Sequence, residues 1–149
     1  MKYIDNIYLP IVKKFFFNLI QDYDVSQLSE IHLTRTKTKH STYGACYPPD
    51  ITKDKKYKIR AYLKTDHDIY PLEDRHWIKV NGKVVKVKWK YDSIEEAAVY
   101  ILSHELFHYL SWTAQLVDRD GKKIKNTEYN ANWFAHGQVA KYSQPLQIL

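Results

Sequence analysis

The stretch from Ser93 to Trp112, SIEEAAVYILSHELFHYLSW, predicts a long helix that carries reactive side chains. Ser93 is followed three residues later by Glu96, a pair that caps the free backbone N–H groups at the start of a helix. Beyond this cap, apolar residues recur at helical spacing toward Glu105. We therefore expect a helix over about residues 93–113.

Five residues of this helix, HELFH at positions 104–108, form a metal-binding pattern. His104 and His108 lie one turn apart on the same helical face, so both imidazoles can reach one metal ion. Glu105 projects beside the same site, where it can take a proton from a water molecule activated by the metal. The alternative is that both histidines are core residues satisfied by hydrogen bonds.

A catalytic zinc ion normally takes three protein ligands, so a third one is expected from a later element. Our first choice is Glu128, which follows the second histidine by 20 residues at the start of a helix predicted over about 127–142. His136 is the alternative, because it lies two helical turns further along the same helix. Asp118 and Asp120 also compete, although they resemble turn residues around a glycine.

Other side chains of the second helix are candidates for supporting roles. Asn132, one turn after Glu128, is expected to hydrogen-bond the outer nitrogen of a ligating histidine and fix its tautomer. An oxyanion formed during hydrolysis needs a further donor. His136, Tyr129 and Tyr142 are candidates for that role, and the sequence does not rank them.

The rest of the chain predicts an α+β fold with a small mixed or antiparallel sheet. Helical spacing indicates an N-terminal helix over about residues 3–23, and alternation indicates strands within about 28–90. Asn81-Gly82 separates two alternating segments and suits a type I′ hairpin turn. Residues 36–54 are interpreted as a loop.

One predicted strand, residues 57–63, alternates apolar and polar side chains. Its apolar members are Ile59, Ala61 and Leu63. We interpret this strand as the edge of the sheet above the metal-binding helix. A free strand edge can pair with an extended peptide through backbone groups alone.

A row of lysines, Lys86, Lys88 and Lys90, alternates with apolar residues along one predicted hairpin strand. We interpret this row first as a solvent-exposed face or a guarded sheet edge. The alternative is a surface that binds nucleic acid. The chain carries a formal net charge of +6, which would favour an anionic partner.

Composition restricts the class of protein. The 149 residues have the size of one domain, assigned here to residues 1–149, and 44% of them are hydrophobic, which argues against disorder. No apolar run approaches the roughly 20 residues that span a bilayer, and no signal peptide is evident, so we expect a cytoplasmic protein without a membrane partner. The single cysteine, Cys46, has no disulfide partner within the chain.

Two segments could regulate the site. A thiolate binds zinc well, so Cys46 could block the metal in a latent form, although a lone cysteine is more often a small buried hydrophobic residue. The C-terminal residues 145–149 could lie in the cleft, although a frayed or docked tail is the simpler interpretation.

The two candidate ligand segments have the pattern His104-Glu105-x-x-His108 followed by Glu128-x-x-Ala131-Asn132-x-Phe134-Ala135. Together they resemble the gluzincin metallopeptidases, especially minimal single-domain members of the ImmA/IrrE type. The resemblance covers about residues 57–136. It implies a zincin-like fold, zinc bound by His104, His108 and Glu128, and Glu105 as general base in peptide-bond hydrolysis. Two departures are that no helix-turn-helix domain is evident, and that Asn132 stands where many gluzincins place Asp.

A second resemblance is to SprT-like proteases, through residues 43–47 ahead of a strand and through His136-Gly137. Those enzymes imply a histidine as third ligand and a DNA-associated substrate. The sequence thus predicts a zinc-dependent peptidase that acts on a protein or peptide. The alternative from another class is a catalytically silent module that binds zinc together with nucleic acid or protein.

Overall fold

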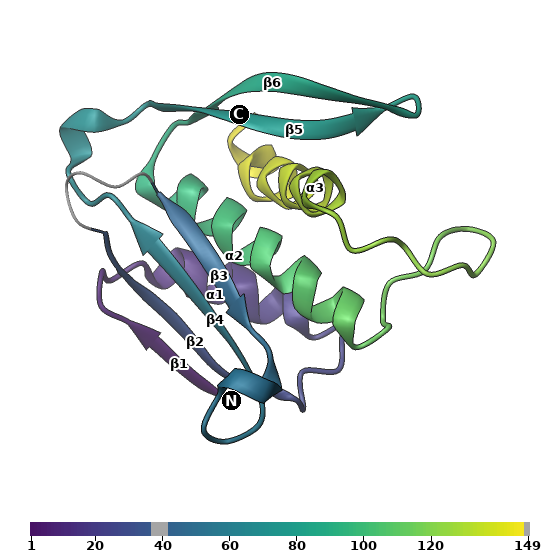
Figure 1. Ribbon diagram of the computed structural model, residues 1–149. Helices are drawn as coiled ribbons and strands as arrows, with labels where there is room; N and C mark the ends of the chain where they lie inside the picture. Colours follow the sequence, from purple (N-terminus) through teal and green to yellow (C-terminus); the bar gives the residue numbers. More distant parts are fainter. Residues whose placement is uncertain (37–41, 148–149) are drawn as a thin grey trace.

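A four-stranded sheet, a long central helix and a separate β-hairpin form successive layers of the molecule (Figure 1). The computed structural model describes residues 1–36 and 42–147. The elements in chain order are β1 (Lys2–Asp5), α1 (Pro10–Ile20), β2 (Leu28–Arg35), β3 (Tyr43–Tyr47), β4 (Tyr57–Leu63), β5 (Leu72–Val80), β6 (Lys83–Tyr91), α2 (Ile94–Trp112) and α3 (Glu128–Gln147), with short 3-10 turns at Pro49–Ile51 and His67–Ile69. The predicted α+β class is confirmed.

The four-stranded sheet has the order β1-β2-β4-β3. β1, β2 and β4 are parallel, and β3 runs antiparallel to β4 at the edge. In-register pairs such as Ile31 with Ile59 and Leu33 with Ala61 point their side chains to the same face, where all four are fully buried. This apolar face is the one that α1 and α2 cover (Figure 1).

The prediction that residues 57–63 form the edge strand is wrong. β4 lies between β2 and β3, and Ile59, Ala61 and Leu63 belong to the core. The sheet's edges are β1 and β3, and the edge strand that contacts α2 is β3, which lies within the segment interpreted as a loop. Alternation shows only that one face of a strand is covered, whereas the position of a strand within the sheet depends on pairing between distant segments.

The N-terminal segment also differs from the expected helix over residues 3–23. Residues 2–5 form a parallel strand, and the helix begins only at Pro10, whose fixed φ suits the first helical turn. Between them, the carboxylate of Asp5 accepts hydrogen bonds from the backbone N–H groups of Ile7, Tyr8 and Leu9 at 2.9, 2.8 and 2.6 Å. These bonds satisfy the donors of a sharp turn that separates β1 from α1.

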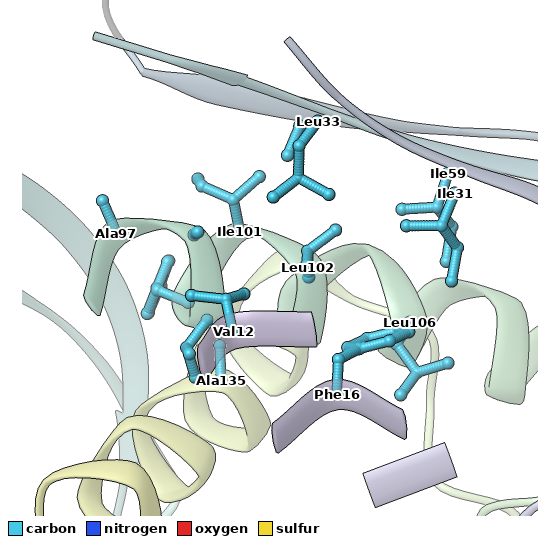
Figure 2. Close-up of a cluster of buried hydrophobic side chains, with 14 of the residues drawn as sticks. Val12, Phe16, Ile31, Leu33, Ile59, Ala97, Ile101, Leu102, Leu106 and Ala135 are labelled. Atoms are coloured by element: carbon cyan, nitrogen blue, oxygen red, sulfur yellow. The ribbon is translucent and has the colours of Figure 1, made fainter. Parts of the chain in front are cut away.

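The core fills the space between the sheet and the two helices. Figure 2 shows Ile31, Leu33 and Ile59 extending from the sheet toward α2, with Val12 and Phe16 of α1 packed beside it. α2 is buried on nearly all sides because the sheet, α1 and α3 each cover part of its surface. A helix in this position holds its side chains rigidly.

The predicted hairpin is confirmed, but it forms its own two-stranded sheet, β5-β6. Asn81 and Gly82 have φ values of 50° and 81°, as the two central positions of a type I′ turn require. The hairpin packs mainly on α3 (Figure 1).

The helix predicted over 127–142 is present as α3, and its backbone continues past Pro145 to Gln147. The predicted C-terminal tail is therefore helical as far as residue 147, and residues 148–149 lie outside the described part of the chain. No helix among the described residues is long and apolar enough to span a membrane.

Candidate metal centre

Two helices bring three potential metal ligands together. His104 and His108 lie on α2, whose first turn is capped as expected: the Ser93 hydroxyl accepts a hydrogen bond from the backbone N–H of Glu96 at 3.1 Å. Glu128 is the first residue of α3. The Thr127 hydroxyl accepts a hydrogen bond from the N–H of Asn130 at 3.2 Å, which fixes where this helix begins.

The three side chains converge on a common point. The Nε2 atoms of His104 and His108 are 3.2 Å apart, and they lie 3.0 and 3.1 Å from the two carboxylate oxygens of Glu128. Bonds of about 2.0 Å to a tetrahedral zinc ion place its ligand atoms roughly 3.3 Å apart, so this spacing suits such an ion. Among the described side chains, this is the single group of three that could hold a metal.

The centre combines sheltered imidazoles with an accessible carboxylate. The imidazoles of His104 and His108 are 14% and 12% exposed, whereas the side chain of Glu128 is 73% exposed. Hydrogen bonding with the two imidazoles holds the pKa of the Glu128 carboxyl well below its usual range, so this group is an anion at neutral pH. The donor set is therefore open to solvent on the Glu128 side, as a catalytic rather than a closed structural centre requires.

The tautomer of His108 is set by Asn126, a residue that sequence reasoning missed. The Nδ1 atom of His108 lies 2.6 Å from the Asn126 side-chain oxygen, which can only accept, so the imidazole carries a proton on Nδ1. When the imidazole is neutral, the lone pair is then on Nε2, which faces Glu128. The only signal in the sequence was an amide in the loop directly before the ligand helix.

The prediction that Asn132 would hold a ligating histidine is wrong. Its side-chain oxygen accepts a hydrogen bond from the Tyr100 hydroxyl at 2.6 Å, and its amide nitrogen donates to the Trp77 carbonyl at 2.7 Å. Helical spacing correctly placed Asn132 one turn after Glu128. It could not show that the Tyr100 hydroxyl of α2 would take the Asn132 oxygen, or that the hairpin would dock there and take its amide nitrogen.

Glu105 lies against the edge strand of the sheet. The residue is 6% exposed, and burial raises the pKa of its carboxyl. A Cβ at Gly44 of β3 would come within 2.8 Å of Glu105 Cγ and 2.6 Å of Ile101 Cγ2, so only glycine allows this approach. The strand backbone therefore packs directly on α2 at the general-base candidate.

A cavity of about 340 Å³ lies between the edge strand β3, α2 and the hairpin. It extends from Tyr43 and Gly44 of β3 across His104 and Glu105 to the hairpin. The centre therefore adjoins a space that a ligand can enter.

His136, the alternative third ligand, lies outside the group of three. Its Nε2 is 3.1 Å from Nδ1 of His76, and its ring packs against Trp89 and Tyr100. Burial, together with the neighbouring His76, lowers the pKa of His136 to about 4, so its imidazole is neutral at pH 7. The geometry thus brings Glu128, and not His136, to the two histidines of α2.

The remaining candidates do not join the centre. The ring of Tyr129 lies under the ammonium group of Lys79 at 5.6 Å, and Tyr142 packs edge-on against Phe15 of α1 at 5.5 Å. Cys46 packs against the core, and burial, with a smaller contribution from the Glu105 carboxylate, raises the pKa of its thiol. Cys46 is therefore half-buried against the core, and its thiol is not among the clustered ligand atoms.

Sequence reasoning also missed a buried polar cluster that joins the hairpin to α2. His76 Nε2 lies 3.0 Å from the Tyr91 hydroxyl and 3.3 Å from the Asp74 carboxylate, and the His76 ring stacks on Tyr100 at 4.4 Å. The available signal was that polar residues occupy inward positions of both hairpin strands. These contacts fix the hairpin beside the metal centre.

Comparisons with protein families, with curated proteins and with solved structures found no match to this chain. The functional argument therefore depends on the geometry of the centre itself.

Proposed function

We propose that this protein is a zinc-dependent peptidase with a centre of the gluzincin type. The observation that carries the proposal is the convergence of His104, His108 and Glu128, with ligand atoms 3.0 to 3.2 Å apart, beside the buried carboxyl of Glu105. A carboxylate as third ligand favours the gluzincin type over the SprT type, which would need His136.

The arrangement around α2 supports a zincin-like fold as part of the same proposal. A mixed sheet with one antiparallel edge strand covers the helix that carries both histidines, and the next helix supplies the third ligand. The edge strand is β3, so we assign to β3 the substrate-pairing role first expected of residues 57–63.

Zinc, when bound, would lower the pKa of a water molecule and polarise a peptide carbonyl. The chain itself supplies the groups that move protons and orient the substrate. The Glu105 carboxylate accepts the proton of the attacking water and returns it to the leaving amine nitrogen. Its burial favours this exchange, because a raised pKa makes the carboxylate a better base.

The substrate is held as an extended strand. β3 pairs with β4 along one edge, and its residues Tyr43 and Gly44 line the cavity beside Glu105. Backbone N–H and C=O groups on the free edge can pair with a peptide of any sequence, which would place a scissile bond next to His104, His108 and Glu128. Side chains around the cavity would then select among sequences.

Elemental analysis and a cleavage assay test this proposal together. We expect one zinc ion per chain in the wild type and in His136→Ala, and loss of zinc in Glu128→Ala. We expect Glu105→Gln to retain zinc and to cleave an unfolded protein such as reduced casein at least about 100-fold more slowly.

The outcomes separate the competing interpretations. Zinc lost only in His136→Ala would indicate an SprT-like centre, and absence of zinc from wild type after reconstitution would refute the metallopeptidase. Zinc retained without cleavage of any peptide in a diverse library would instead identify a catalytically silent zinc module.

A further inference from the structure

The β5-β6 hairpin presents a cationic face to solvent. In-register pairing puts Glu73 with Lys90, Arg75 with Lys88, Trp77 with Lys86 and Lys79 with Val84 on one side of the ribbon. All eight of these side chains are exposed. We call this set the cationic face; it holds five cations and one carboxylate, for a net charge of +4.

The hairpin's opposite side accounts for most of its docking, and within the cationic face Lys79 contacts α3 through the Tyr129 ring. His76 and Tyr91 point inward to Tyr100, and Trp89 packs on His136. The outward set lies on the far side of the same two strands, which form the outermost layer in Figure 1.

Charge on the cationic face is not neutralised within the molecule. Arg75 stands directly across from Lys88, and like charges in opposite positions of a strand pair are destabilising. The ion pairs formed by the described side chains include none of the five cations of this face. Repulsion between these like charges therefore destabilises the hairpin, and binding of an anionic partner would relieve the repulsion.

An aromatic platform lies among these charges. The Trp77 side chain is 50% exposed, and the Lys86 ammonium group lies 5.4 Å from the centre of its ring. Further along the same strands, Glu73, Asp74, Arg75 and Lys88 line a hollow of about 320 Å³, in which two carboxylates lie beside two cations. A flat indole between cations is the combination that stacks a nucleobase while phosphates are neutralised.

We infer that the cationic face binds single-stranded nucleic acid, with Trp77 stacking a base and Arg75, Lys86 and Lys88 contacting phosphates. An acidic protein fits less well, because protein interfaces have an apolar centre depleted of charge, whereas nucleic-acid interfaces are strongly positive. A membrane surface fits less well too, because interfacial binding needs several inserting apolar side chains. Trp77 and Val84 are the two large apolar residues of the cationic face, whereas the exposed Val80 and Val85 lie on the other side of the hairpin.

This activity is separate from peptide hydrolysis, although the two surfaces are adjacent. Arg75 and Trp77 belong to the cationic face and also line the cavity beside His104 and Glu105. A bound strand would therefore pass the mouth of the metal centre and hold nucleic-acid-associated polypeptides near it.

Fluorescence anisotropy of a labelled oligothymidylate of about 12 nucleotides tests the inference on the full chain. Each phosphate contact contributes a slope of about −0.7 to the dependence of log affinity on log salt, so Arg75→Gln/Lys88→Gln should reduce the magnitude of the slope by roughly 1.4. The matched control is Lys53→Gln/Lys56→Gln, which removes the same charge from an exposed loop ahead of β4. This control should keep the wild-type slope.

The stacking contact has its own test. Trp77→Ala should weaken binding roughly 10-fold or more at unchanged salt slope, since base stacking is largely independent of salt. Trp133→Ala is the control, because Trp133 is an equally open indole, 58% exposed, on α3. Circular dichroism and zinc content should be unchanged in all four variants.

Several results would overturn the inference. These are no binding at low salt, equal losses in the two charge variants, or full affinity in Trp77→Ala. Equal or tighter binding to duplex DNA, to polyglutamate or to phosphatidylserine vesicles would show that the cationic face serves another partner. None of these results depends on zinc, so the peptidase proposal stands or falls separately.

Discussion

The two sides of α2 differ in what they contribute. Toward the sheet and α1, Leu102 and Leu106 are fully buried among aliphatic side chains (Figure 2). Toward α3 and the hairpin, the same helix presents Tyr100, His104 and His108, each bonded to polar partners. The first side stabilises the molecule, and the second holds reactive groups in fixed positions.

Packing physics explains why the two roles are divided. An aliphatic contact is non-directional, so the sheet side contributes stability without specifying orientation. A buried polar group must find a partner of the right geometry, so the hairpin side permits few arrangements and sets each imidazole precisely. Four substitutions test this division.

The largest effect is expected from Leu102→Ala on the sheet side. Deleting this fully buried side chain should lower the free energy of unfolding by about 2–5 kcal/mol, because the rigid surroundings leave a cavity. Urea denaturation measures the change. Ile11→Ala, at a side chain 63% exposed, is the control and should change stability by less than about 0.5 kcal/mol. Equal effects at both positions would contradict the assignment of the core.

The next largest effect is expected on the side of α2 that faces α3 and the hairpin. Asn126→Ala should weaken zinc affinity roughly 10- to 100-fold, because His108 loses the acceptor that fixes its tautomer. Competition with a zinc chelator measures it. Asn126→Asp keeps an acceptor oxygen and should restore most of the affinity, whereas unchanged affinity in Asn126→Ala would show that the contact does not orient the ligand.

Gly44→Ala tests the boundary between the two sides. The added methyl would meet Ile101, Glu105 and the Arg60 carbonyl at 2.6, 2.8 and 3.1 Å, so we expect a loss of about 1–3 kcal/mol and slower peptide cleavage. Gly137→Ala is the matched control, because no atom lies within 4 Å of its added methyl. That helical substitution should raise stability by up to about 1 kcal/mol. A larger loss of stability in Gly137→Ala than in Gly44→Ala would contradict the close approach of β3 to α2.

The smallest effect is a pH dependence at the hairpin. The pKa of His136 is lowered to about 4 by burial and by His76, so the unfolded chain binds more protons than the folded one between that value and about 6.5. The stability that the neutral His136 contributes is fully present above about pH 6.5, and it is lost as the pH falls from there to about 4. In denaturation at pH 7 and pH 4.5, His136→Gln should lose less stability on acidification than wild type. An identical loss would place His136 in solvent.

The local patterns of the sequence were sufficient for several elements. The Ser93 cap and the spacing after it correctly predicted α2, and Asn81-Gly82 predicted the hairpin turn. The HELFH pattern predicted that both histidines share a face, and the structure places their Nε2 atoms 3.2 Å apart. Each of these features depends on residues a few positions apart, and over that distance the local backbone geometry alone determines which groups lie close together.

Other features could not be read in this way. Residues 2–5 and 43–47 form strands only because they pair with β2 and β4, and Asp5 separates β1 from α1 by accepting three N–H bonds. Asn132 lay at the expected helical position but bonds to Tyr100 of α2 and to the Trp77 carbonyl of the hairpin that docks there.

The sequence by itself determined that His104 and His108 share one helical face, that Glu105 follows the first of them, and that Ser93 caps their helix, because each of these relations spans only one helical turn. Only the tertiary structure decided that Glu128 reaches the histidines while His136 does not, that β3 is the edge strand, and that Asn126 holds His108. Those contacts join segments that no local periodicity relates, and they form only when the packing of the sheet, α3 and the hairpin around α2 brings the segments together.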